Sequence, residues 1–232
     1  MKKRTAQLIV ALDVGTLREA KALIKSLGPS VGIYKVGSQL FTAFGPEVIR
    51  VLAKARKKTF LDLKYHDIPN TVYNAVGSAV SLNVVMLTVH ISGGKQMLEA
   101  AAKAAREQAK KMKVSRPLVV GVTVLTSEAD QGNVKDIIIE KARLAKSCGL
   151  DGVVASPQEA KMIRNELGEG FIIVTPGIRP SGAAAGDQKR TATPKEAVLS
   201  GSDFLVVGRP IVQAADPSQA ARAILDEIKK VQ

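Results

Sequence analysis

The densest group of ionisable side chains lies in the run FLDLKYHDIPNT, which spans residues 60–71. Asp62 and Lys64 stand two positions apart, so on a β-strand their side chains leave the same face. Asp67 follows three positions later and adds a second carboxylate. Paired acidic and basic groups are the residue types of acid–base and electrostatic catalysis. The spacing therefore indicates a charge-based reaction site near the end of a strand.

A purely structural role is the alternative for the same residues. Asp67 precedes Pro69 and would serve as the N-cap of a helix, while Asp62 and Lys64 would form a structural ion pair. A buried carboxylate–ammonium pair, however, seldom recovers the free energy lost on desolvation. A pair of this kind at the end of a strand therefore favours a functional site.

Two further motifs combine glycine with arginine. TPGIRP covers residues 175–180 and VVGRP covers residues 206–210, and each begins at the end of a Val/Ile-rich run. Glycine lets backbone N–H groups approach an anion, and arginine supplies a charged fork. One such pair would be an ordinary turn followed by a surface arginine. Two pairs at adjacent strand ends indicate a phosphate site.

These motifs stand among short apolar runs that alternate with amphipathic stretches. The predicted strands are Leu8–Leu12, Ile33–Val36, Phe60–Leu63, Val84–Val89, Leu118–Val124, Gly152–Ala155, Ile172–Val174 and Phe204–Val207. The predicted helices are Leu17–Leu27, Pro46–Arg56, Thr71–Ser81, Lys95–Lys111, Val134–Ser147, Pro157–Leu167 and Pro217–Lys230. Alternating strands and helices imply a parallel sheet covered on both faces. About eight such units favour an α/β fold with a single (β/α)8 TIM barrel domain over residues 1–232, and an open doubly wound sheet is the alternative.

One segment departs from this rhythm. Residues 177–194, GIRPSGAAAGDQKRTATP, are too long and too rich in glycine and alanine for a plain connection. A long loop after a late barrel strand often closes over a ligand. We therefore expect a lid here.

The composition predicts a cytoplasmic protein. The chain has a single cysteine, Cys148, which suits a reducing compartment. No apolar run approaches the roughly 18 residues of a membrane helix, so no membrane partner is expected. The 34 lysines and arginines against 21 acids give a net charge of +13, which raises nucleic-acid binding as a hypothesis. The basic residues are scattered and aromatics form only 3% of the chain, so a solvated helical surface is favoured and no nucleic-acid partner is predicted.

Together the motifs resemble the orotidine 5′-phosphate decarboxylase family. The likeness rests on DLKYHDIPNT with ALDV, YKVG, TPGIRP and VVGRPI, and it extends from Leu8 to Ile211. The pattern Asp-x-Lys-x-x-Asp alone is shared with sugar-phosphate enzymes of the same superfamily. HDIPNT combined with both phosphate motifs is far more specific.

The resemblance implies conversion of orotidine 5′-monophosphate to UMP and CO2 without a metal or organic cofactor. Lys64 would protonate C6 of the pyrimidine and stabilise the carbanion forming there, and Asp62 would lie beside the substrate carboxylate. Lys35 would position Asp62 and contact the ribose. Asp67 would complete the array by reaching into the active site of a partner, which implies a homodimer with active sites at its interface.

The same resemblance implies the substrate contacts. Asp13 would accept hydrogen bonds from ribose hydroxyls, and Thr71 would line the ribose and phosphate region of the neighbouring subunit. Thr126 would contact the pyrimidine ring. The phosphate would be bound by Arg179, Gln188, Gly208 and Arg209, with Gln188 reaching from the lid.

Two rival functions make different predictions. A related decarboxylase or aldolase acting on a keto-pentulose or hexulose phosphate would use the Asp/Lys/Asp set to hold Mg2+, so it would depend on metal. A basic nucleic-acid-binding protein on a barrel scaffold would bind oligonucleotides with a steep salt dependence and would be indifferent to substitution of Lys64.

Overall fold

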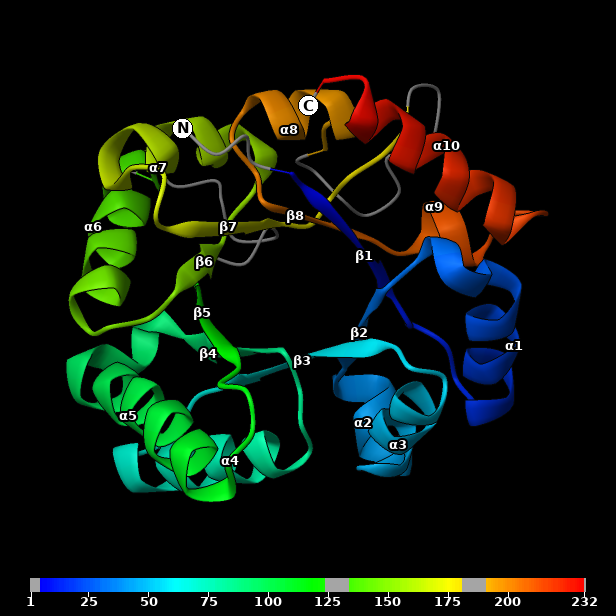
Figure 1. The fold of residues 1–232 in the computed structure, drawn as a ribbon. Coiled ribbons are helices and arrows are strands. Elements are labelled where there is room, and N and C mark those ends of the chain that lie inside the picture. The colour runs from blue at the N-terminus through cyan, green and yellow to red at the C-terminus, as the bar shows by residue number, and fades with distance from the viewer. Residues whose placement is uncertain (1–4, 124–133, 181–190, 232) are drawn as a thin grey trace.

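Eight parallel strands close into a barrel in which each strand pairs with its neighbours in chain order, β8 returning to β1 (Figure 1). The structure, a computed structural model, describes residues 5–123, 134–180 and 191–231. The strands are β1 (Gln7–Ala11), β2 (Ile33–Gly37), β3 (Lys58–Tyr65), β4 (Met86–His90), β5 (Leu118–Val122), β6 (Gly152–Val154), β7 (Ile172–Thr175) and β8 (Phe204–Val207). The closed order confirms the predicted (β/α)8 barrel and excludes the open sheet.

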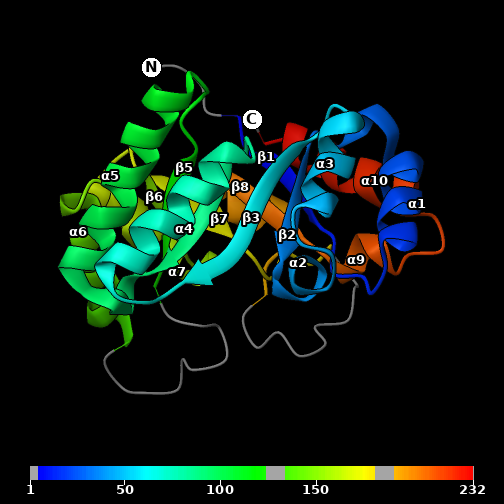
Figure 2. The same ribbon diagram turned by 90° about the horizontal axis from the view of Figure 1, so that it is seen from below.

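The helices lie outside the ring of strands, with α4 and α5 on one flank and α1 and α3 on the other (Figure 2). They are α1 (Leu17–Leu27), α2 (Ser38–Phe44), α3 (Glu47–Lys54), α4 (Pro69–Ser81), α5 (Gly94–Met112), α6 (Val134–Ser147), α7 (Pro157–Leu167), α8 (Pro194–Leu199), α9 (Arg209–Val212) and α10 (Pro217–Lys229). Two short 3₁₀ helices, η1 (Gly28–Ser30) and η2 (Ile91–Gly93), precede β2 and α5.

The seven predicted helices are present, three of them with the predicted bounds and four with ends shifted by one or two residues, whereas α2, α8 and α9 were not predicted. These three helices have only four to seven residues each, which is too short for a repeating apolar face. Helix α8 begins where Thr193 caps it through the backbone N–H of Glu196. A local cap, rather than periodicity, determines where this helix starts.

Two apolar layers stabilise the barrel. The inner cluster fills the barrel itself with side chains from seven of the eight strands, namely Ile9, Ala11, Ile33, Phe60, Met86, Val120, Val174 and Val206. The outer cluster lies between the strands and the helices and is larger. Because alternate residues of a strand face inward and outward, both layers draw on the same strands. The rigid wall that results holds the strand ends in fixed relative positions.

The predicted lid segment is only partly described. Ile178 forms an isolated parallel bridge with Ala192, and the backbone N–H of Arg179 donates to the carbonyl of Ala192 at 2.9 Å. The two ends of the segment are therefore held together next to β7. Residues 181–190 lie outside the described residues.

Within the described part of the chain, no helix is both long enough and apolar enough to span a membrane.

Candidate active site

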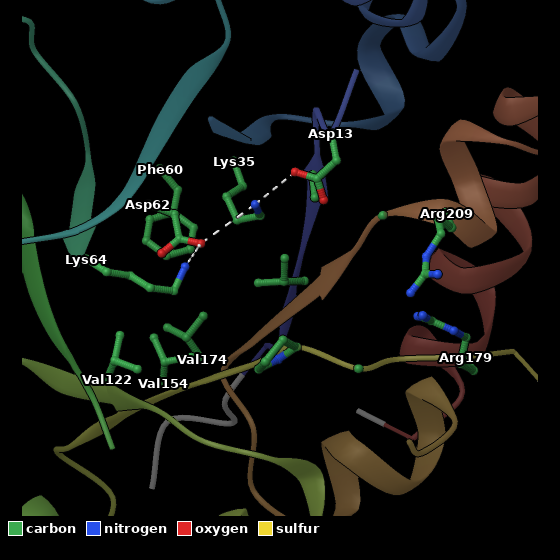
Figure 3. A pocket seen from close by; sticks show the side chains of 15 residues that line it. Asp13, Lys35, Phe60, Asp62, Lys64, Val122, Val154, Val174, Arg179 and Arg209 are labelled. Carbon is green, nitrogen blue, oxygen red and sulfur yellow. Dashed lines mark hydrogen bonds and ion pairs between the residues drawn. The ribbon is translucent and has the colours of Figure 1, made fainter. Parts of the chain in front are cut away.

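A cavity of about 260 Å³ opens where the strands end at their carboxyl termini (Figure 3). Its apolar floor includes Ala11, Phe60, Val174 and Val206, which also belong to the inner cluster of the barrel. The polar lining consists of Asp13, Lys35, Asp62, Lys64, Arg179 and Arg209, with glycines at 177 and 208. Polar groups concentrated over a closed apolar floor are typical of a ligand site in this fold.

Four of these side chains form a continuous chain of alternating charge (Figure 3). Lys35 Nζ lies 3.1 Å from Asp13 Oδ1 and 3.6 Å from Asp62 Oδ2. Lys64 Nζ lies 2.9 Å from the same Asp62 oxygen. One carboxylate oxygen is therefore shared by two ammonium groups.

The centre of this chain is shielded from water. The side chains of Asp62 and Lys35 are 11% and 13% exposed, while that of Lys64 is 36% exposed. Electrostatic interactions strengthen as water is excluded. The two ends of the chain, Lys64 and Asp13, are more accessible, and Asp62 and Lys35 lie between them.

The backbone of β3 is distorted where it presents Lys64. Lys64 has a positive φ of 52°, in the left-handed region that L-residues seldom adopt. The pairing of β3 with β4 shifts register between Leu61 and Tyr65, which marks a bulge. Bulges near active sites redirect a side chain. The distortion lets Lys64 turn its ammonium back onto Asp62.

The two arginines lie at the other end of the cavity. Arg179 follows β7 and Arg209 follows β8, and Figure 3 shows their guanidinium groups close to one another, across the cavity from Lys64. Beside them, a methyl group on Gly208 would lie 3.4 Å from Asp13 Oδ2. Glycine therefore allows the loop after β8 to approach the residue that follows β1.

Gly37 leaves space for the side chains of Lys35 and Asp13, and substituting it tests whether their positions matter. A methyl group at this position would lie 3.2 Å from Lys35 Nζ and 3.7 Å from Asp13 Oδ1. We expect Gly37→Ala to displace the Lys35 ammonium and to lower kcat/KM for the reaction proposed below by about tenfold, since small displacements of groups that act on a substrate are costly. Steady-state kinetics would measure this, with Gly32→Ala, where a methyl group meets nothing within 4 Å, as the control. Equal rates for both variants would contradict the role of Gly37.

Two predicted site residues, Asp67 and Thr71, do not line this cavity. Asp67 and Thr71 are exposed on the same chain. The Asp67 carboxylate accepts a hydrogen bond from the backbone N–H of Ile68 at 2.6 Å. Helix α4 begins after Ile68 without a side-chain cap, so the alternative of Asp67 as its N-cap was wrong. Thr126 and Gln188 lie outside the described residues.

Two residues that contact this chain of charges were not predicted from the sequence. Thr88, on β4, hydrogen-bonds both Asp62 and the backbone of Lys64. Gly37 abuts Lys35 and Asp13, as described above. The one available signal for Thr88 was a polar residue inside the apolar run MLTVH, at a position that is fully buried.

Two tyrosines on the barrel strands stay neutral under ordinary conditions. Burial raises the pKa of Tyr34 to about 12 and also raises the pKa of Tyr65, because both phenols lose hydration. They therefore add no charge to the barrel near neutral pH.

Across residues 5–123, 134–180 and 191–231, no three His, Cys, Asp or Glu side chains are grouped so as to hold a metal ion.

Comparisons with known proteins agree with this geometry. The model of the orotidine 5′-phosphate decarboxylase / HUMPS family matches residues 6–224. Orotidine 5′-phosphate decarboxylase of Moorella thermoacetica is 47% identical over 97% of this chain and 93% of its own length. The enzyme of the same name from Syntrophomonas wolfei is 45% identical over 97% of this chain and 98% of its own length.

A solved structure shares the fold as well. The crystal structure of orotidine 5′-phosphate decarboxylase from Lactobacillus acidophilus has a TM-score of 0.85 and 38% sequence identity, over 97% of this chain and 99% of that one. The family match covers most of the chain, and the identities hold over nearly its full length. The chain therefore belongs to the orotidine 5′-phosphate decarboxylase / HUMPS family.

Proposed function

We propose that this protein decarboxylates orotidine 5′-monophosphate to UMP and CO2, a step of pyrimidine biosynthesis. The observation that carries the proposal is the cavity with Lys64, Asp62 and Lys35 at one end and two arginines at the other. The first end suits a reaction that develops and quenches negative charge on carbon. The second end suits a phosphate.

The chemistry requires no group beyond the protein and the substrate. The bond between C6 and the carboxylate breaks, CO2 leaves, and the electron pair stays on C6. The Lys64 ammonium stabilises this carbanion, then donates a proton to C6 and recovers one from solvent. The Asp62 carboxylate lies beside the departing carboxylate and disfavours the bound ground state. Lys35 pairs with Asp62 at 3.6 Å, holds it in position and contacts the ribose, whose hydroxyls donate to Asp13.

The phosphate end provides binding energy that acts on the distant reaction. Arg179, Gly208 and Arg209 bind the phosphate, joined by Gln188, and Thr126 contacts the pyrimidine ring. Contacts far from C6 raise the rate when they hold the reacting group against the charged chain. The phosphate therefore contributes to the rate of the reaction as well as to the affinity for the substrate.

The active enzyme is a homodimer in this proposal, with Asp67 and Thr71 entering the partner's cavity. Both residues are exposed and lie outside their own chain's cavity, which supports such a role. Ile68, between them, is 66% exposed, a large apolar side chain that a partner would cover.

A mixing experiment tests the shared site. Lys64→Ala and Asp67→Ala are each expected to be inactive alone, because each removes one charge from every site. After mixing and subunit exchange, a mixed dimer regains one intact site, made from Lys64 of one chain and Asp67 of the other. A 1:1 mixture should therefore recover about one quarter of wild-type activity. If the mixture stays inactive although exchange is demonstrated, the sites are not shared.

A substrate panel distinguishes the proposal from its metal-dependent rival. The protein is incubated with orotidine 5′-monophosphate or with a keto-hexulose phosphate that carries a carboxylate. Each reaction is run with added Mg2+ and with EDTA. We expect rapid release of CO2 from the nucleotide in both conditions and none from the sugar phosphate. Turnover of the sugar phosphate that EDTA abolishes would favour the rival instead.

A further inference from the structure

Thr88 touches the charged chain from outside the cavity. It lies at the centre of β4, its side chain is fully buried, and it does not line the cavity. A buried hydroxyl normally needs a hydrogen-bond partner, and this one has two, both on β3.

The bulge in β3 explains why Thr88 is needed there. Leu61 pairs with Leu87 and Tyr65 pairs with Val89, so three β3 residues, 62–64, lie opposite the single β4 residue Thr88. Regular ladder bonds cannot serve all three. The backbone N–H of Lys64 instead donates to Thr88 Oγ1 at 2.9 Å. The side chain thus replaces a backbone acceptor at the point where φ is positive.

The same hydroxyl also orients Asp62. Thr88 Oγ1 donates its hydrogen to Asp62 Oδ1 at 3.0 Å. The other oxygen, Oδ2, faces both ammonium groups, Lys64 at 2.9 Å and Lys35 at 3.6 Å. Hydrogen-bonding Oδ1 prevents the carboxylate from rotating about its last torsion, so Oδ2 stays between the two cations.

We propose that Thr88 is a positioning residue for the decarboxylation, and this inference rests on the function proposed above. One hydroxyl accepts from the Lys64 backbone and donates to the Asp62 carboxylate, so it sets the relative position of the proton donor and the carboxylate beside the substrate. The Thr88 side chain itself does not contact the substrate. Its effect should therefore fall on the chemical step rather than on phosphate binding.

The test compares three substitutions at position 88 with a matched control. Thr88→Val keeps the shape of the side chain and removes the hydroxyl, Thr88→Ala removes it with less bulk, and Thr88→Ser restores it. Thr59→Val is the control, because Thr59 is also a buried threonine, lies near the start of β3 and does not line the cavity. Thermal unfolding of every variant measures any general loss of stability.

We expect Thr88→Val and Thr88→Ala to lower kcat by about 100-fold, the scale reported for a 1 Å misplacement of catalytic groups. The KM for orotidine 5′-monophosphate and the Kd for UMP should stay close to wild type, and Thr88→Ser should recover most of the lost kcat. Thr59→Val, which leaves the charged chain intact, should keep its kcat. If Thr88→Val does not fold, the comparison between Thr88→Ala and Thr88→Ser decides.

A failure of the proposed function and a failure of the role of Thr88 give different results. Absence of wild-type turnover would contradict the proposed function itself. Wild-type turnover with an unchanged kcat in the hydroxyl-free variants would overturn the role of Thr88. So would a fall in kcat that serine does not reverse, or one that Thr59→Val matches, since either would show a general structural effect.

Discussion

Replacing Lys64 by alanine is expected to lower kcat for orotidine 5′-monophosphate by at least about 10⁴-fold, because proton donation and electrostatic stabilisation are lost together. The Lys64 ammonium lies 2.9 Å from Asp62 at the mouth of the cavity, and Lys35 on the far side of Asp62 is held by two carboxylates. Lys35 is therefore badly placed to replace Lys64 as the proton donor. The absorbance change of the nucleotide under single-turnover conditions would measure the residual rate.

Binding should survive this change. The Kd of Lys64→Ala for UMP is expected to remain close to wild type, since UMP lacks the carboxylate and the phosphate is bound at the other end of the cavity. Lys58→Ala is the matched control, because Lys58 is an exposed lysine at the start of the same strand. A Lys64→Ala enzyme with a near-normal rate, or one that no longer binds UMP, would contradict the assigned role.

Arg209→Ala should act in the opposite way, chiefly on binding. Removing a guanidinium that bonds a phosphate costs about 1.5–3 kcal/mol, so the Kd for UMP should rise by about 10- to 150-fold. Uridine has no phosphate, and its weaker binding should be almost unaffected. Calorimetry with both ligands separates the phosphate contact from every other effect.

The control for this arginine is Arg222→Ala, an exposed arginine on the outer helix α10. It removes the same positive charge from a protein with net charge +13 without touching the cavity. If Arg222→Ala weakened UMP binding as much as Arg209→Ala, the effect would come from the general field of the protein. If Arg209→Ala weakened uridine and UMP equally, Arg209 would not be a phosphate contact.

Much of the fold follows from local patterns in the sequence. Val/Ile-rich runs alternating with amphipathic helices predicted all eight strands, because each run must be covered on both faces. Asp62 and Lys64 were placed on one face of a strand by the two-residue period alone. Arg179 and Arg209 were placed together because consecutive parallel strands end side by side.

Other features depend on contacts between distant segments. The bulge of β3 and the left-handed backbone of Lys64 arise from the pairing with β4, and no residue between 61 and 65 signals them locally. Thr88 acquires its role through that same pairing. Lys35 and Asp13 entered the predicted site by family resemblance, since a lone lysine in a strand and an aspartate after one are otherwise unremarkable. The roles proposed for Asp67 and Thr71 involve a second chain, which the sequence of one chain does not place.

The most direct measurement is the ultraviolet absorbance of orotidine 5′-monophosphate mixed with purified protein, with and without EDTA, alongside Lys64→Ala. Conversion to UMP that proceeds equally in EDTA and vanishes in the variant is the expected result, because the reacting charges belong to the protein's own side chains. No conversion by the wild-type protein, or conversion that requires a divalent ion, would contradict decarboxylation by the Lys/Asp array.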